Sequence, residues 1–264
     1  MLTIKDITSH LETIAPLFYQ EGYDNAGLIT GDAGWELSNV LCCLDATEAV
    51  IDHAIQQDCN LVVAHHPIVF KGLKRINGIN YVERTIIKAI KNDIAIYAIH
   101  TNLDNVLYRG VNSKIAEKLG LLHTRILSPK PETNSLEIGS GLIGELPVAM
   151  DEVAFLKKLK ETMLAGCVRH TRLLGRPIKT VALCGGAGSF LLPLAIASRA
   201  DVYITGDFKY HEFFDADGHL VIADIGHFES EQFTIDLLHE IISEKFTTFA
   251  PLKTSVNTNP VHYL

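Results

Sequence analysis

The sequence predicts an α/β protein in which two similar lobes each carry a helix-covered sheet. The first observation is an alternation of strand-length apolar runs with segments of helical periodicity, which is the pattern of βαβ units. The second is that this alternation occurs twice along the chain. The third is size, because 264 residues, 47% of them hydrophobic, can bury a substantial core as one large domain or two small lobes.

Each half of the chain is expected to run strand, helix, strand, second connection, strand. In the first half these segments are residues 39–44, 46–57, 60–66, 81–92 and 94–100. In the second half they are residues 180–186, 189–199, 201–207 and 219–227, followed by a long amphipathic helix at residues 230–246. The expected strands are rich in β-branched and apolar residues, as the buried strands of an α/β sheet require.

The two halves also match each other in register. If Val40 is placed on Val181, one whole βαβ unit aligns without a gap. A different shift then places residues 100–104 on residues 227–231, so that two copies of His-x-x-x-carboxylate follow equivalent strands. The matches are mostly of residue type, which leaves two interpretations: an internal duplication, or the generic pattern of two βαβ units.

A polar join is expected between the halves. Residues 128–141 combine prolines, serines and glycines, the composition of a loop or linker. We therefore expect a first lobe at residues 1–127, a short join at residues 128–141 and a second lobe at residues 142–264, with the functional site between the lobes. The last eight residues contain Pro260 and no helical period, and we expect them to lie along the surface or to pair at a sheet edge.

The composition of the chain argues against several classes of protein. The 23 Lys and Arg residues against 31 Asp and Glu give a net charge of −8, which argues against a broad basic surface for nucleic acid or anionic lipid. The amino terminus lacks a basic region followed by an apolar stretch, and no segment is long and apolar enough for a membrane helix, so we expect a cytoplasmic protein. Five cysteines without a Cys-x-x-Cys pair predict neither a disulfide scaffold nor a thiolate zinc site.

Two adjacent histidines stand where an expected strand ends. His65 and His66 follow the run Asn-Leu-Val-Val-Ala and precede Pro67, which disfavours a helix at that point. The carboxyl ends of strands are where ligands gather in open α/β sheets, because loops there point side chains into a shared crevice. The alternative interpretation is one packed and one exposed histidine.

Further candidate ligands follow two other expected strands. Asp104 comes after the strand that ends in His100, although an aspartate there can also be a turn or capping residue. His227 and Glu231 follow the strand that ends at Gly226 and are spaced i and i+4, so they share one face of a helix. A first-turn carboxylate beside an incidental histidine is the alternative for this pair.

The five residues together indicate a metal site. His65, His66, Asp104, His227 and Glu231 exceed the roughly three or four protein ligands of one zinc ion. They match two divalent ions that share a bridging carboxylate and a water molecule. Imidazole and carboxylate suit zinc, iron or manganese, and also nickel or cobalt.

Other polar residues allow two interpretations each. His100 and His211 are candidates for hydrogen bonds behind the ligands or for a proton shuttle, or they are structural histidines. Asp24 and Asn25 look like turn residues that could also reach the cluster. The loop Gly185–Ser189 follows a strand and opens a helix, so it either binds a phosphate with its amides or forms a tight turn.

The motifs of the chain resemble those of the Nif-three-like family, also described as GTP cyclohydrolase I type 2 homologues or dinuclear metal-centre hexameric proteins. The matching segments are YDNAGL at residues 23–28, VVAHHP at 62–67, AIHTNLD at 98–104, GSGLIGEL at 139–146, TGDFKYHE at 205–212, GHFESE at 226–231 and TNPVHYL at 258–264. They span almost the whole chain and are specific as an ordered set.

The resemblance implies two intertwined α/β lobes with mixed sheets, a dinuclear centre and a toroidal homohexamer. Its ligand positions fall on the five residues named above, with Glu231 as the bridging ligand. Many relatives carry an additional domain of roughly a hundred residues between their halves. The short expected join leaves no room for that domain here.

Three functions follow as hypotheses. The first is a metal-dependent hydrolase whose reactive group is a metal-activated water; the resemblance suggests ring opening of GTP, while phosphoester or amide hydrolysis would suit the same ions. Its substrate would be a small molecule, with a nucleotide as one candidate. The second is a metal storage or delivery protein without turnover. The third, disfavoured by the acidic balance, is a ring that encloses nucleic acid.

Overall fold

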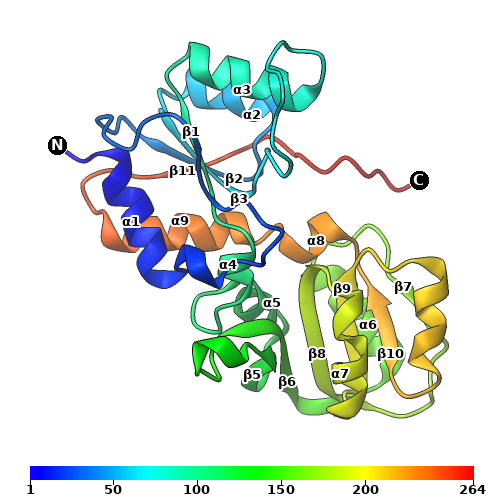
Figure 1. The fold of residues 1–264 in the computed structure, drawn as a ribbon. Helices are drawn as coiled ribbons and strands as arrows, with labels where there is room; N and C mark the ends of the chain where they lie inside the picture. Colours follow the sequence, from blue (N-terminus) through cyan, green and yellow to red (C-terminus); the bar gives the residue numbers. More distant parts are fainter. The chain divides into compact units, whose positions relative to one another are not determined.

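The computed structural model describes residues 1–264 and divides them into two compact units (Figure 1). Unit 1 comprises Met1–Leu103 and Thr234–Pro260, and unit 2 comprises Asp104–Phe233 and Val261–Leu264. Each unit is therefore assembled from two separate stretches of chain. The expected fold of two intertwined α/β lobes with mixed sheets is confirmed.

Unit 1 is built around a five-stranded sheet in the order β1-β4-β3-β2-β11. The strands are β1 (Gly27–Thr30), β2 (Val40–Asp45), β3 (Leu61–His66), β4 (Ala95–Ala98) and β11 (Leu252–Lys253). β2, β3, β4 and β11 run parallel, whereas β1 pairs antiparallel with β4 at one edge. The central strands are buried almost throughout, which is why their sequences are continuous apolar runs and do not alternate.

Helices cover both faces of this sheet (Figure 1). α2 (Glu48–Gln56) and α3 (Tyr81–Lys91) pack on one face, and α1 (Ile4–Ile14) and α9 (Thr234–Lys245) on the other. Thr47 and Asn80 cap α2 and α3 by accepting backbone N–H bonds, so each helix begins where its polar cap stands. Two short helices remain. The 3-10 turn η1 (Leu17–Tyr19) lies within unit 1, and the chain leaves unit 1 within α4 (Thr101–Asp104).

Unit 2 contains a six-stranded sheet in the order β5-β6-β8-β9-β10-β7. The strands are β5 (Leu122–Pro129), β6 (Gly139–Met150), β7 (Arg169–His170), β8 (Ile178–Ala187), β9 (Val202–Gly206) and β10 (Val221–Asp224). β8, β9 and β10 are parallel, and the remaining pairs are antiparallel. This parallel core is the βαβ unit that the alternation of apolar and helical segments predicts.

Helices also cover both faces of the sheet of unit 2. The 3-10 turns η3 (Ser189–Leu191) and η4 (Tyr210–Ala216) and helix α7 (Leu192–Ala197) bury apolar side chains on one face. α5 (Val111–Leu119) packs against β6 and β8, and α6 (Glu152–Thr162) packs against α5. Figure 1 shows α7 in front of the strands and α6 behind them.

The internal match between the halves extends to hydrogen-bonding register. Val40 is the partner of Leu61 in unit 1, and Val181 is the partner of Val202 in unit 2, as the overlay of Val40 on Val181 requires. Further along, the N–H of Ile99 donates to Ala64 in unit 1, and the N–H of Ile225 donates to Thr205 in unit 2. The duplicated α/β fold is therefore visible in the backbone pairing of each unit.

One inserted residue separates the two copies after these strands. His100 follows Ile99 directly, whereas Gly226 stands between Ile225 and His227. Gly226 has a φ of +94°, a conformation that favours glycine. Ile99 and Ile225 are equivalent by their hydrogen bonds. His100 therefore matches His227 only if Gly226 is treated as an inserted residue.

The expected boundaries of the lobes differ from those of the structure. Residues 128–141 lie inside unit 2, where Ser128 pairs with Ser140 across the β5–β6 hairpin and Pro131 opens the 3-10 turn η2 (Pro131–Thr133). Their polar composition marks a turn. The chain instead passes from unit 1 to unit 2 within α4, and it returns to unit 1 at Thr234. The composition of the sequence does not change at either point.

The helix expected at residues 230–246 is divided in two. α8 (His227–Glu231) belongs to unit 2, and α9 begins at Thr234 in unit 1. Between them, the Gln232 side chain donates to Met163 and the Lys118 ammonium lies 4.0 Å from the centre of the Phe233 ring, contacts that belong to unit 2. The amphipathic period continues across the break and therefore conceals it.

The structure agrees with the expectations for the cysteines and for the carboxyl-terminal segment. No cysteine forms a disulfide, and four of the five are buried, with burial raising the pKa of Cys42 to about 12. The carboxyl-terminal residues 257–264 form neither helix nor strand and are largely exposed. None of the helices has the length and apolar character needed to span a bilayer.

Candidate metal-binding residues

Three imidazoles converge in unit 1 at the carboxyl ends of β3 and β4. His65 and His66 are the last residues of β3, and His100 follows the adjacent strand β4. One ring nitrogen of each histidine lies within 4.8 Å of those of the other two. Their ring centroids are 4.9, 5.2 and 5.3 Å apart. We call these three residues the histidine cluster.

Each member of the histidine cluster is oriented through its Nδ1 atom. Nδ1 of His65 lies 2.9 Å from the carbonyl oxygen of Ile99, Nδ1 of His66 lies 2.8 Å from Asp45 Oδ1, and Nδ1 of His100 lies 2.8 Å from Asp24 Oδ1. A carbonyl or carboxylate oxygen only accepts, so in each case Nδ1 carries the proton and donates it. In the neutral ring Nε2 is then the basic nitrogen, the tautomer that binds a metal ion.

Asp24 is held by several donors. Its carboxylate accepts from Thr101 N (3.0 Å) and the Thr101 hydroxyl as well as from His100, and its side chain is fully buried. Burial works against ionisation, but hydrogen bonds from His100 and Thr101 outweigh it and lower the pKa of Asp24 to about 2. Of the two turn residues singled out from the sequence, Asp24 thus reaches the histidine cluster, while Asn25 donates to the Val69 carbonyl oxygen.

Asp45 also contacts the histidine cluster, although the sequence did not single it out. It ends β2 and is the register partner of His66 on β3, so the sheet itself brings the two side chains together. Burial raises its pKa, but the hydrogen bond and charge of His66 and a bond from the Thr258 hydroxyl (2.6 Å) lower it further than burial raises it. The edge argument applied to His66 would have found Asp45, because both end parallel strands.

Unit 2 holds the other three expected ligands. His227 and Glu231 are one helical turn apart on α8, and His227 Nε2 lies 3.1 Å from Glu231 Oε2. A carboxylate oxygen of Asp104 lies within 4.8 Å of one of Glu231. Burial is the main cause that raises the pKa of the nearby Cys184 thiol, and the negative charges of Asp104 and Glu231 raise it further. The structure therefore groups Asp104, Glu231 and His227 within unit 2.

Asp207 orients His227 as Asp45 orients His66. Asp207 Oδ2 lies 2.7 Å from His227 Nδ1. Burial lowers the pKa of His227, but its hydrogen bonds to Asp207 and Glu231 and their negative charges dominate and raise the pKa well above its usual value. Binding of a metal ion at Nε2 would therefore replace a proton there.

Two glycines allow the close packing around α8. A Cβ on Gly186 would lie 2.4 Å from Glu231 Oε1, and its φ of +64° favours glycine. A Cβ on Gly206 would lie 2.8 Å from the backbone nitrogen of His227 and 2.9 Å from its Cα. The strand ends of unit 2 thus approach His227 and Glu231 at distances that exclude a side chain.

The Gly185–Ser189 loop forms a turn, and three of its five amides already donate to side chains. The N–H groups of Gly185, Gly186 and Gly188 donate to Asn112 Oδ1, Ser230 Oγ and Thr205 Oγ1, respectively. Strand β8 continues to Ala187, and helix α7 begins only at Leu192. The phosphate-binding interpretation therefore loses the three glycine donors, and the tight turn is the interpretation that the structure favours.

His211 lies away from the residues of the candidate site. Its ring contacts those of Tyr210 and Phe214, with centroids 5.2 and 6.5 Å away, on the exposed turn η4. No hydrogen bond joins it to Asp207 or His227. The structure thus gives His211 surface packing contacts, whereas His100, the other histidine considered alongside it, is a member of the histidine cluster.

The carboxyl-terminal Tyr263 supports the start of α8. Its ring lies against Gly166, where an added Cβ would be 2.3 Å from the ring, and its hydroxyl bonds to the carboxylate of the buried Glu229. Burial and the charge of Glu229 raise the pKa of Tyr263 to about 12. The protonated hydroxyl is therefore the donor at neutral pH.

We expect Tyr263→Phe to lower the free energy of unfolding by about 1 kcal/mol, because the buried Glu229 carboxylate loses a donor while the ring remains. Urea denaturation of both proteins measures this difference. Tyr210→Phe, which removes an exposed hydroxyl from the same unit, is the control and should change stability by less than about 0.5 kcal/mol. Equal unfolding midpoints for Tyr263→Phe and the wild type would contradict the assignment.

Comparison with known proteins gives a consistent match along the chain. The family model for Duf34/NIF3 (NGG1p interacting factor 3) matches residues 2–260. A Clostridium perfringens protein named GTP cyclohydrolase 1 type 2 homolog is 34% identical over 245 residues, covering 92% of each chain. A relative of the same name from Clostridium acetobutylicum is 33% identical and covers 87% of this chain and 85% of its own.

Solved structures share the fold over its whole length. The crystal structure of a Bacillus cereus protein related to NIF3 superposes with a TM-score of 0.91 at 26% identity, covering 100% of both chains. These similarities agree with the resemblance that the sequence motifs carry.

Proposed function

Because the chain belongs to the Duf34/NIF3 family, we propose that it is a metal-dependent hydrolase that uses two divalent ions. The observation that carries the proposal is the histidine cluster, in which three imidazoles present Nε2 atoms whose tautomer is set by acceptors at Nδ1. Such second partners are typical of metal-binding histidines, because they fix the tautomer and the orientation of the ring. The name of the relatives, GTP cyclohydrolase 1 type 2 homolog, supports hydrolysis as the reaction class.

The proposed ligands are His65 and His66 from unit 1 and Asp104, His227 and Glu231 from unit 2, with Glu231 as the bridging carboxylate. Their donor chemistry fits the ions proposed, because imidazole nitrogen and carboxylate oxygen suit zinc, iron or manganese. Asp45 and Asp207 fit as well, since each fixes one ligand imidazole through Nδ1. His100 adds a third imidazole beside His65 and His66.

The protein's own groups would perform distinct tasks in the reaction. When bound, the ions supply Lewis acidity and lower the pKa of a water molecule for attack on a carbonyl, ring carbon or phosphoryl group. Asp24 and Asp45 keep His100 and His66 in one tautomer. Glu231 is buried and lies against His227, so its carboxylate is placed to hold the ions in a fixed position beside that imidazole.

Metal content per chain tests the proposal. We expect about two ions per chain, by elemental analysis, in protein purified without chelator. The double variant His65→Ala/His227→Ala should lose them, whereas His53→Ala/His170→Ala, with one histidine removed from each unit outside the candidate site, should retain them. Metal-free wild-type protein that takes up no added zinc, iron or manganese would refute the proposal.

Turnover separates the hydrolase from a storage or delivery protein. A hydrolase should show a rate on GTP or on a panel of phosphoesters that Glu231→Gln abolishes. Exchangeable metal without any rate above background would favour storage, which the same ligands would serve.

The remaining expectations form part of the proposal. We propose a small-molecule substrate of the nucleotide class, a cytoplasmic location and a homo-oligomer, with a hexamer as the expected state. Light scattering of the purified protein measures the number of subunits. Nucleic acid is not an expected partner because of the net charge of −8.

A further inference from the structure

The loop that follows the histidine cluster carries an unusual set of side chains. Residues 67–80 join β3 to α3 and begin directly after His66. Within five residues the loop places Lys71, Lys74 and Arg75, all exposed, in a chain whose net charge is −8. None of the three forms an ion pair, although other lysines of unit 1, such as Lys88, do. Cations left unpaired in an acidic protein are available to an anionic ligand.

An aromatic residue connects this loop to the histidine cluster. The Phe70 ring meets the His100 ring edge to face, with centroids 5.6 Å apart, while half of the Phe70 side chain remains exposed. An exposed aromatic face beside a polar cluster is a surface on which a planar ring can stack. Phe70 is therefore the point of the loop that lies next to the candidate metal ligands.

The loop is fastened at both ends. Asn25 donates to the carbonyl oxygen of Val69 (2.7 Å), and the Asp24 beside it binds His100, so the turn at residues 23–26 ties Phe70 to the histidine cluster. At the other end, the Glu83 carboxylate accepts from the N–H groups of Asn77 (3.1 Å) and Ile79 (3.0 Å). The cations thus stand on a segment whose path is set by specific hydrogen bonds.

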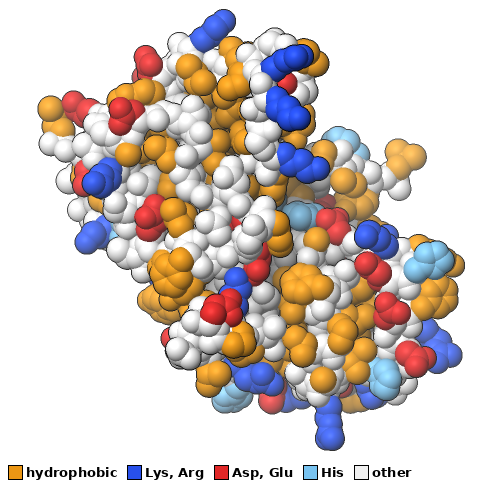
Figure 2. All heavy atoms as spheres, viewed as in Figure 1, with side chains coloured by type: hydrophobic (Ala, Val, Ile, Leu, Met, Phe, Trp, Pro, Cys, Tyr) orange, Lys and Arg blue, Asp and Glu red, His pale blue; other side chains and the backbone are white.

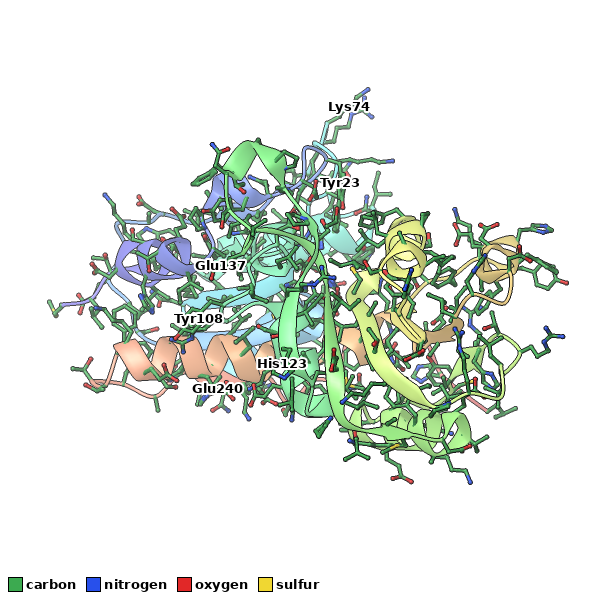
Figure 3. The ribbon with its side chains drawn as sticks, turned by 90° about the horizontal axis from the view of Figure 1, so that it is seen from below. Tyr23, Lys74, Tyr108, His123, Glu137 and Glu240 are labelled. Carbon is green, nitrogen blue, oxygen red and sulfur yellow. The ribbon has the colours of Figure 1, made fainter.

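The order of these side chains along the loop gives a direction. Phe70 contacts His100, and Lys71, Lys74 and Arg75 follow at increasing separation along the chain. Figure 2 shows Lys and Arg side chains gathered along the edge of unit 1 that carries α3 and this loop. In Figure 3 the Lys74 side chain extends away from the rest of the structure, at the same edge of the view as Tyr23. Phe70 is thus the member of this set with a ring contact to the cluster, and the three cations follow it along the chain.

We propose that Phe70, Lys71, Lys74 and Arg75 form a subsite for a phosphorylated compound with a planar ring, whose ring stacks on Phe70 and whose phosphates bind the three cations. Its relevance to catalysis rests on the proposed function, since it places the ring of the substrate, and not its phosphates, beside the histidine cluster. Among the reactions that two metal ions allow, this orientation selects attack on the ring over phosphoester hydrolysis. Ligand binding to the subsite itself needs no turnover.

Equilibrium binding of three probes tests the subsite. Inorganic triphosphate reports on the cations, guanosine on the aromatic surface, and GTP on both. In Lys71→Gln/Lys74→Gln/Arg75→Gln the Kd of triphosphate and of GTP should rise by about tenfold or more, with that of guanosine unchanged. In Phe70→Ala the Kd of guanosine and GTP should rise while that of triphosphate stays the same. Lys91→Gln, an exposed lysine at the end of α3 without an ion pair, should leave all three unchanged.

The outcomes separate this inference from the proposed function when metal content is measured on the same samples. Unchanged triphosphate affinity in the triple variant, or an equal loss in Lys91→Gln, overturns the subsite even if two ions per chain are found. Loss of triphosphate binding confined to the triple variant supports the subsite even if the protein holds no metal. If Phe70→Ala weakens triphosphate as much as guanosine, the assigned orientation of ring and phosphates is wrong.

Discussion

The Asp24→Asn variant should be less stable than the wild type by about 2–3 kcal/mol at neutral pH, which we expect to be among the largest effects of any single polar substitution in unit 1. The side chain of Asp24 is fully buried and accepts from His100 and Thr101. An asparagine presents an N–H₂ group where one carboxylate oxygen now accepts, so at least one buried donor would lose its partner. Urea denaturation of chelator-treated protein measures the difference.

The pH dependence of this effect has a definite sign. The pKa of Asp24 is about 2 in the folded protein against 3.8 as its ordinary value, so its contribution to stability is fully present above about pH 4. It is lost as pH falls toward 2, and the shift amounts to about 2 kcal/mol. Wild type and Asp24→Asn should therefore converge in stability as the pH falls from 4 to 2.

Asp52→Asn is the matched control for Asp24→Asn. Asp52 is half exposed and pairs with Lys88 at 2.7 Å on the surface of unit 1, so its loss should cost less than about 1 kcal/mol. A cost for Asp24→Asn no larger than that of Asp52→Asn would show that the bonds to His100 and Thr101 do not stabilise the fold. A difference from wild type that persists at pH 2 would show that this stabilisation does not depend on the charge of Asp24.

The Gly206→Ala variant should both destabilise unit 2 and impair metal binding. The added methyl group would lie 2.8 Å from the nitrogen and 2.9 Å from the Cα of His227, and 2.9 Å from the carbonyl carbon of Gly226. These are backbone atoms, which cannot rotate away as a side chain can, so the start of α8 must move. Overpacking of this kind costs about 1–3 kcal/mol, and the movement displaces His227 from Asp207.

Two measurements check the Gly206→Ala prediction: the unfolding midpoint, and the metal content of protein purified without chelator. Gly22→Ala is the control, because a Cβ at Gly22 meets nothing within 4 Å, and it should change neither quantity. Wild-type stability and metal content in Gly206→Ala would mean that α8 tolerates displacement and that its packing against β9 does not position His227.

The two units position their candidate metal ligands in different ways. In unit 1 a carboxylate at the end of β2 orients a histidine at the end of β3, and in unit 2 a carboxylate that follows β9 orients the histidine that begins α8. The role of orienting carboxylate is thus filled from different positions in the two copies. Gly226, which has no counterpart before His100, moves His227 one residue further from its strand.

Features that depend on short stretches of sequence could be predicted without the structure. The strands around His65, the alternation of strands and helices, and the i, i+4 spacing of His227 and Glu231 all depend on neighbours within one helical turn or one strand. Local periodicity and the polar residues that end strands are sufficient for these features, because backbone geometry fixes which side chains share a face. The same local signals placed His65 and His66 at a strand end.

Tertiary structure alone decided the partners of those residues and the division of the chain. Asp24 and His100 meet because β1 pairs antiparallel with β4, which brings the residues before β1 beside those after β4. Asp45 meets His66 only through the register of β2 and β3. The break between α8 and α9 and the passage between units at Leu103 follow from which core buries each helix. Such pairings depend on contacts between residues far apart in sequence, which periodicity and composition do not record.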